Sequence, residues 1–146
     1  MRYLIGVDFQ AGPDETPMEE WTREEVAAHL DYYRVLNQEL VASGELIDTT
    51  ILTGPHLAKV VRSDGRGAPV VTDGPFQEFK EWLAGYQIVE VESEERAIEI
   101  AALVSAVPGR NGVPTQQPIH LRRVMDDDGP FGPNEMEEYL QQATRA

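Results

Sequence analysis

The clearest pattern in the chain is the alternation of apolar and polar residues that half-buried β-strands show. This pattern and the turn residues around it predict strands at residues 2–9, 46–52, 85–91 and 119–125. Four side chains of the first strand share one face: Tyr3, Ile5, Val7 and Phe9. We therefore expect a sheet with one face packed against a core.

Two longer segments have the spacing of amphipathic α-helices. The first starts after Thr22, which forms a capping-box pattern with Glu25, and ends at Gly44, which suits a left-handed C-cap. Its apolar face is predicted to hold Val26, Leu30, Leu36, Leu40 and Val41. The second helix starts after Ser93, and its apolar stripe is Ala97, Ile100, Ala101, Val104 and Val107.

Glycine- and proline-rich segments between the second and third strands predict smaller elements. Residues 58–62 and 69–72 are expected to form a hairpin, and residues 76–83 a short helix. The complete order is typical of the ferredoxin-like α+β fold, one antiparallel sheet with both helices on one face. The opposite face needs cover if it is apolar, so we expect two chains to pair through it as a homodimer.

The composition excludes several classes of protein. The chain has 146 residues with 12 Lys+Arg against 26 Asp+Glu, a net charge of −14, and no cysteine. This charge disfavours binding to nucleic acid or to anionic membranes. The lack of cysteine excludes disulfides, thiolate metal sites and a cysteine nucleophile. No signal peptide or membrane-spanning pattern is recognisable, so a cytoplasmic location is expected.

The length predicts one domain with a short appendage. The domain is expected to cover residues 1–125. Residues 126–146 form an acidic extension, interrupted by glycine and proline, with a helix predicted near its end. Two interpretations remain open for this extension, docking on a partner subunit and a frayed tail.

A row of polar residues lies inside the apolar face of the first predicted helix. His29, Tyr33 and Asn37 are four residues apart, so they line up along the buried side. Buried polar groups need partners, which either a ligand pocket or ordinary contacts with the sheet would supply. In an enzyme His29 would be the base and Tyr33 a proton donor or oxyanion partner, with Asn37 in the substrate site.

Three charged or titratable residues outside this helix are further candidates. Asp73, which precedes Gly74-Pro75-Phe76, can cap a following helix, but it can also orient a histidine or take a proton. His120 and Arg122 share one side of the last predicted strand. There they either line a cavity, in which Arg122 binds a carboxylate or an oxyanion, or form an edge pair in water.

Sequence motifs for metals and nucleotide cofactors are missing. The three histidines are far apart in sequence, and no His-x-x-x-His pair or calcium-loop pattern occurs. The dinucleotide fingerprint, the phosphate loop and the Gly-x-Ser-x-Gly motif are also absent. We therefore expect neither a metal nor a cofactor.

Three segments resemble the YCII-related, or DGPF-domain, family. The most specific is VVTDGPFQEFKEWLAGYQIVEVES at residues 70–93, where Asp73, Phe76, Glu78 and Lys80 match the family motif. Residues 32–48 resemble the first helix of the family and the turn that follows it, and residues 118–125 resemble the last strand. The resemblance implies a ferredoxin-like fold that dimerises into an α+β barrel, and it places Phe76 among the candidate substrate contacts.

The same resemblance implies several functions. Some relatives carry a proposed His–Asp pair in a cleft, one class dehydrochlorinates chlorinated hydroxyquinols, and others are linked to extracytoplasmic-function sigma factors. Many members place a histidine where this chain has Tyr33, and His29 stands one turn earlier. In the last strand, His120 and Arg123 replace residues that are commonly Glu and Pro.

Two hypotheses for function follow. The first is a cofactor-independent lyase- or isomerase-type enzyme with His29 as base, Tyr33 as donor and Asp73 as orienting carboxylate. The second is a non-catalytic dimer that binds a small organic ligand or a regulatory protein, with its acidic surface as the recognition surface. In a third interpretation the polar rows are only structural, and the site lies on loops.

Overall fold

The computed structural model describes residues 1–10, 18–73 and 81–125, together with Gln141 and Thr144. The main body is a four-stranded antiparallel sheet in the order β2-β5-β1-β6. Its strands are β1 (Arg2–Gln10), β2 (Leu46–Ile51), β5 (Glu81–Glu90) and β6 (Ile119–Arg123). This is the α+β class expected from the sequence, and its element order is β-α-β-β-α-β once an inserted hairpin is set aside.

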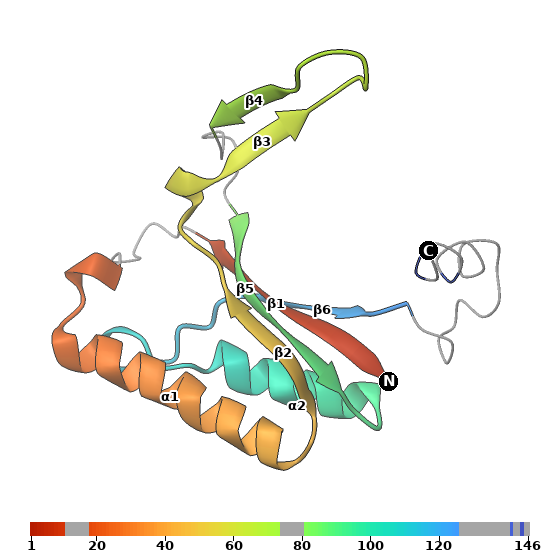
Figure 1. The fold of residues 1–146 in the computed structure, drawn as a ribbon. Helices are drawn as coiled ribbons and strands as arrows, with labels where there is room; N and C mark the ends of the chain where they lie inside the picture. Colours follow the sequence, from red (N-terminus) through yellow and green to blue (C-terminus); the bar gives the residue numbers. More distant parts are fainter. Residues whose placement is uncertain (11–17, 74–80, 126–140, 142–143, 145–146) are drawn as a thin grey trace.

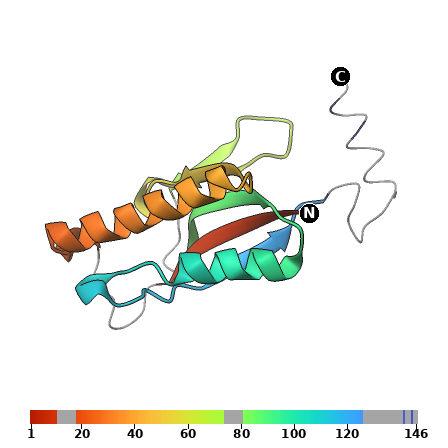
Figure 2. The same ribbon diagram turned by 90° about the horizontal axis from the view of Figure 1, so that it is seen from below.

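Two helices cover one face of this sheet. They are α1 (Arg23–Ala42) and α2 (Glu94–Ser105), and Figures 1 and 2 show both of them on the same side. Short 3₁₀ helices flank them at Met18–Glu20, Pro55–Leu57 and Arg110–Gly112. The other face of the sheet bears no helix within the described part of the chain. We call it the open face.

The inserted hairpin forms a second, two-stranded sheet. Strands β3 (Lys59–Arg62) and β4 (Val70–Asp73) pair antiparallel with each other and not with the main sheet. Figure 1 shows the hairpin projecting from the end of the main sheet, away from both helices. The hairpin predicted from the sequence is therefore confirmed, and it stands apart from the core.

The core lies between the helices and the sheet. It combines alternate residues of the strands with one stripe from each helix: Tyr3, Ile5, Leu36, Leu40, Val89, Val91, Ala97, Ile100, Ala101 and Val104. Val107, directly after α2, is also buried. The stripe predicted for the second helix is thus confirmed in full.

The ends of α1 form as their residue types predict. Thr22 accepts a hydrogen bond from the Glu25 N–H, and the Glu25 carboxylate accepts one from the Thr22 N–H, which completes the capping box. Gly44 follows the helix with φ at +77°, a conformation that L side chains rarely adopt. These local contacts explain why the sequence located both ends of the helix.

Two sequence predictions about the elements are wrong. Residues 81–83, expected at the end of a short helix, belong to β5, because pairing with β1 extends that strand to Glu81. The remainder of that prediction, residues 76–80, lies outside the described residues. On α1, Leu30 and Val41 are 52% and 64% exposed, because the helix touches the sheet and α2 along a narrower line than its apolar arc.

A single chain does not form the α+β barrel that the family resemblance implies for the dimer. Its four-stranded sheet is open and not closed. In the part of the chain that is described, no helix has the length and hydrophobicity needed to cross a membrane. The predicted extension at residues 126–146 lies outside the described residues apart from Gln141 and Thr144.

Candidate functional site

His29 is fixed in place from three directions. Its Nδ1 lies 2.9 Å from the carbonyl oxygen of Pro108, in the segment that follows α2. Its ring makes edge contacts with Trp21 and Tyr33, with centroids 5.4 and 5.3 Å apart. The side chain is half-buried. These contacts hold the imidazole in one orientation beside the N-terminal half of α1.

The Pro108 contact determines which nitrogen of His29 carries the proton. A carbonyl oxygen only accepts hydrogen bonds, so Nδ1 must donate. In the neutral ring the lone pair is then on Nε2. Nε2 forms no hydrogen bond to any described residue, so it can accept a proton or a hydrogen bond from a ligand.

Tyr33 stands next to His29 on the same face of α1. Burial raises the pKa of its hydroxyl to about 12, so the phenol stays protonated at neutral pH. Its hydroxyl has no hydrogen-bond partner within residues 1–10, 18–73 and 81–125. Tyr32 differs, because its hydroxyl donates to the Leu103 carbonyl oxygen at 2.7 Å. Tyr33 is thus an uncommitted donor, whereas Tyr32 ties α1 to α2.

Asn37 ends the row and meets a buried amide of the sheet. Gln87 Nε2 donates to Asn37 Oδ1 at 2.6 Å, and Gln87 is only 5% exposed. Gln87 Oε1 is buried without a partner among the described residues. Rotating the Gln87 side-chain amide by 180° exchanges its nitrogen and its oxygen. One of the two atoms still has no partner among the described residues. Such an atom costs about 1–3 kcal/mol unless a ligand or water meets it.

The row therefore joins helix and sheet into one polar strip. His29 and Asn37 are eight residues apart, or about 12 Å along the helix axis. Gln87 sits on β5 between Ile5 of β1 and Thr49 of β2, on the face that carries the helices. We call His29, Tyr33, Asn37 and Gln87 the helix-face site. It offers a lone pair, a phenolic donor and amide groups in a line.

Asp73 lies elsewhere in the chain. It is the last residue of β4 and is 84% exposed, and its carboxylate accepts a hydrogen bond from Lys59 Nζ at 2.7 Å across the hairpin. Within the described residues it makes no contact with His29 or Tyr33. The Pro108 carbonyl oxygen instead orients the imidazole, while a catalytic role for Asp73 stays a prediction.

His120 and Arg122 lie on the open face. Their β1 partners in the ladder are Gly6 and Leu4, which point away from the helices. His120 Nδ1 is in ion-pair contact with Asp8 Oδ2. The sequence analysis did not single out Asp8. The alternation that placed Tyr3 and Ile5 on the core face could have placed Asp8 on the open face, but not next to a strand so distant in sequence.

Two residues that contact the predicted polar row were also missed, Gln87 and Pro108. Gln87 interrupts the apolar alternation that continues with Val89 on β5 and Val91 just after it, and this was a visible signal. Pro108 acts through its backbone carbonyl, for which the sequence has no signal. Phe76, the remaining predicted substrate contact, lies outside the described residues, as do Glu78 and Lys80 of the family motif.

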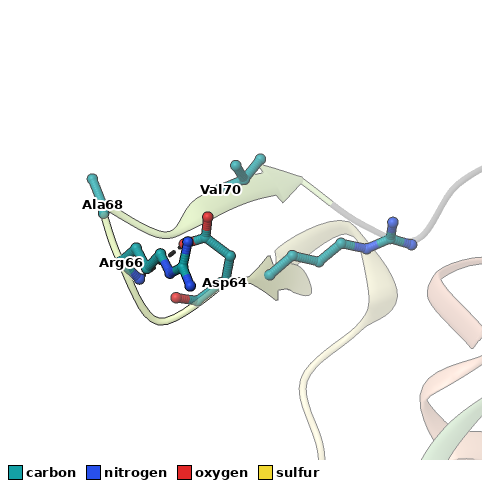
Figure 3. A pocket seen from close by; sticks show the side chains of 7 residues that line it. Asp64, Arg66, Ala68 and Val70 are labelled. Carbon is teal, nitrogen blue, oxygen red and sulfur yellow. Dashed lines mark hydrogen bonds between the residues drawn. The ribbon is translucent and has the colours of Figure 1, made fainter.

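Two shallow hollows are found on the described surface. One, of about 540 Å³, is at the tip of the β3–β4 hairpin, where Figure 3 shows the Asp64 carboxylate bonded to the Arg66 backbone N–H at 2.9 Å. The other, of about 420 Å³, lies between α1 and α2 beside Tyr32 and Leu103. In this loop the Ser63 hydroxyl accepts a hydrogen bond from the Gly65 N–H, and the Asp64 carboxylate accepts the one from Arg66. No cluster of three metal-ligating side chains occurs in the described part of the chain.

The fold and these sites define an α+β protein with one histidine, His29, on a helix that covers the sheet and another, His120, on the open face. Comparison with known families identifies the chain as a member of the YCII-related domain family, whose model matches residues 1–119. It is similar to an uncharacterised protein of Rhizobium meliloti (strain 1021). The two are 27% identical over 108 residues, which cover 74% of this chain and 86% of that relative.

Proposed function

We propose that this protein is a cofactor-independent enzyme that moves protons on a small organic molecule, of the lyase or isomerase type. The observation that carries the proposal is the orientation of His29. The Pro108 carbonyl binds Nδ1 and leaves Nε2 as an available base beside a protonated phenol. An acid and a base placed side by side are what proton abstraction with elimination or isomerisation requires.

Each residue of the helix-face site has a role in this proposal. His29 Nε2 takes a proton from the substrate, and the Tyr33 hydroxyl donates to the oxygen on which charge develops. The paired amides of Asn37 and Gln87 orient the polar end of the substrate, which supplies the hydrogen bond that Gln87 lacks. The edge-on ring of Trp21 limits the motion of the imidazole.

A substrate panel tests the proposal directly. The full chain is incubated in D₂O with hydroxylated and halogenated phenols, a panel chosen from the family resemblance, and deuterium incorporation and halide release are followed. We expect turnover by the unaltered protein and a loss of about 10²-fold or more in His29→Gln. His56→Gln is the matched control, because His56 lies in an exposed 3₁₀ turn. Full turnover by a folded His29→Gln variant would remove His29 from the mechanism.

A non-catalytic binding protein is the second candidate. The unpaired amide atom of Gln87 favours ligand binding as much as it favours catalysis. The two candidates differ in one respect: a binding protein holds a panel compound without changing it. If the unaltered protein binds a panel compound without converting it, the binding-protein candidate is favoured. This candidate includes the ligand-responsive regulatory role proposed from the family resemblance.

We also propose that two copies pair through their open faces. Leu4, Tyr86 and Ile88 are partly exposed on this face, and no described element of the chain covers them. Apolar groups on a sheet face are stabilised when a second layer covers them. The expected homodimer would bring two four-stranded sheets face to face.

A further inference from the structure

A groove lies between the two helices, which Figure 2 shows side by side over the sheet. It is the hollow of about 420 Å³ described above, and most of its lining is apolar: Ala28, Tyr32, Val35, Leu36, Leu103 and Pro108. Val35 and Leu103 are 40% and 41% exposed, so the groove opens to water. No element in the described part of the chain covers it. We call it the interhelix groove.

Carboxylates alternate with apolar residues along the α1 side of this groove. Glu24, Ala28, Asp31, Val35 and Glu39 follow one another at intervals of three or four residues, so they form one stripe of the helix. All five are exposed. The three carboxylates are spaced by about 10.5 and 12 Å along the helix axis. The stripe therefore presents one negative charge about every two turns, with an apolar residue in between.

The arginines beside the groove do not cancel this negative charge. On α1 Arg34 pairs with Asp31 at 2.6 Å. On α2 Arg96 pairs with Glu99 at 3.0 Å and with Glu45, in the turn after α1, at 2.9 Å. Both cations are thus already bound by carboxylates of this chain. An approaching molecule meets a surplus of negative charge.

Glu39 is the carboxylate that is available in the groove itself. It lines the hollow and forms no ion pair with any described residue. Burial and, second, the negative charge of Glu39 raise the pKa of the Tyr32 hydroxyl, so this carboxylate lies near the ring. The Tyr32 hydroxyl is itself bound to the Leu103 carbonyl oxygen at 2.7 Å, which joins the two helices across the groove.

We propose that the interhelix groove is the docking site for a cationic amphipathic helix of a partner protein. The apolar stripe of that helix packs on Val35 and Leu103, and lysine or arginine residues two turns apart face Asp31 and Glu39. A helix laid in a groove between two others buries its apolar side by ordinary helix packing. The groove contains none of the four residues of the helix-face site.

The charge of this groove disfavours two other occupants. A second copy of this chain carries the same net charge of −14, so its approach to an acidic stripe is opposed. Residues 126–146 are also mostly acidic, so they do not complement this surface. The partner is therefore a basic segment of another protein.

Fluorescence anisotropy tests the proposal with the full chain and a labelled model helix, acetyl-LKKLLKLLKKLLKL-amide, as the probe. We expect saturable binding at low ionic strength that weakens as salt is added, because ion pairs hold the sides of the probe helix. The control peptide acetyl-LEELLELLEELLEL-amide has glutamate in place of every lysine. It should not bind.

Matched variants locate the bound probe. Glu39→Gln should weaken binding by about twofold to fivefold, because one exposed ion pair is lost. Asp64→Asn removes the same charge from the tip of the hairpin and should bind as the unaltered protein does. Val35→Ser should weaken binding by about fivefold or more, because apolar contact is lost. Val41→Ser is its control, since Val41 is 64% exposed on a different side of α1.

Four results would overturn the proposal. Normal binding by Val35→Ser would place the probe elsewhere. An equal loss in Glu39→Gln and Asp64→Asn would show only a general attraction to an acidic protein. Full displacement of the probe by millimolar butylammonium would show a site for a small cation. A smaller sedimenting species for Val35→Ser than for the unaltered protein would show that a second copy covers the groove.

Discussion

At the scale of single residues, the distinctive features are polar groups held where apolar ones would pack more simply. Gln87 occupies a core-facing position on β5 beside Ile5 and leaves one amide atom without a partner among the described residues. Tyr33 buries a phenol whose hydroxyl makes no hydrogen bond to the described part of the chain. Such groups lower the stability of the fold, so they mark a site of binding or chemistry more specifically than charge or exposure does.

The high pKa of Tyr33 predicts a pH dependence of stability. In the unfolded chain the phenol ionises near pH 10, whereas in the folded chain its pKa is about 12. Between these values the folded state holds more protons, so the free energy of unfolding should fall as the pH rises from about 10 to 12. Urea denaturation across this range should show the decline, and Tyr33→Phe should reduce it.

The control for this prediction is Tyr86→Phe, which removes a phenol from the open face. A Tyr33→Phe profile that matches the unaltered protein would contradict the burial argument. The substitution itself should not lower stability at pH 7, because it removes no hydrogen bond to the described residues.

At the scale of elements, α1 carries most of the helix-face site. Contacts at the N-terminal end of α1 hold this helix in position. The Glu25 carboxylate caps the helix through Thr22 and also accepts a hydrogen bond from the Asn111 N–H in the loop after α2. The same loop region contains Pro108, whose carbonyl binds His29. The cap and the site are thus supported by one segment, so a loosened cap should disturb the orientation of the imidazole.

The cap provides a prediction for α1. Thr22→Ala removes the side-chain acceptor for the Glu25 N–H and should lower the free energy of unfolding by about 1 kcal/mol. Thr22→Ser keeps the acceptor and should lose only a fraction of this. Chemical denaturation followed by circular dichroism measures both. An equal loss in the two variants would mean that the hydroxyl bond is not what stabilises the helix end.

At the scale of the whole molecule, the two faces of the sheet differ in what covers them. The helices bury one face, while the open face keeps Ile88 and Leu4 partly exposed beside His120 and Arg122. The β3–β4 hairpin projects beyond the sheet with Val61, Val70 and Val71 more than half exposed. A single chain therefore leaves apolar surface on the open face and on the hairpin.

The oligomeric state follows from the open face. We expect the unaltered protein to sediment as a dimer and Ile88→Asp to sediment as a monomer, because a charge would be buried between two sheets. Ile98→Asp is the matched control, since Ile98 is 54% exposed on α2, and it should stay dimeric. A monomer at every concentration of the unaltered protein, or a dimer in both variants, would contradict pairing through this face.

Much of the fold follows from local rules that the sequence displays. Period-two alternation located the strands, Thr22 with Glu25 and then Gly44 located both ends of α1, and the spacing of apolar residues located the buried stripe of α2. These rules act over a few residues, so one sequence is enough to apply them. They failed at residues 81–83, where pairing with β1 makes a strand of a segment that was expected to be helical.

The sequence by itself determined the strands, the helices and the row of His29, Tyr33 and Asn37, because each depends on neighbours along the chain. Only the tertiary structure decided what these residues meet. Contacts between distant segments brought Pro108 to His29, Gln87 to Asn37 and Asp8 to His120, and placed Asp73 on a hairpin outside the helix-face site. The physical reason is that sheet register and helix packing select partners by the burial of whole faces, and a residue's own neighbours in sequence do not encode that choice.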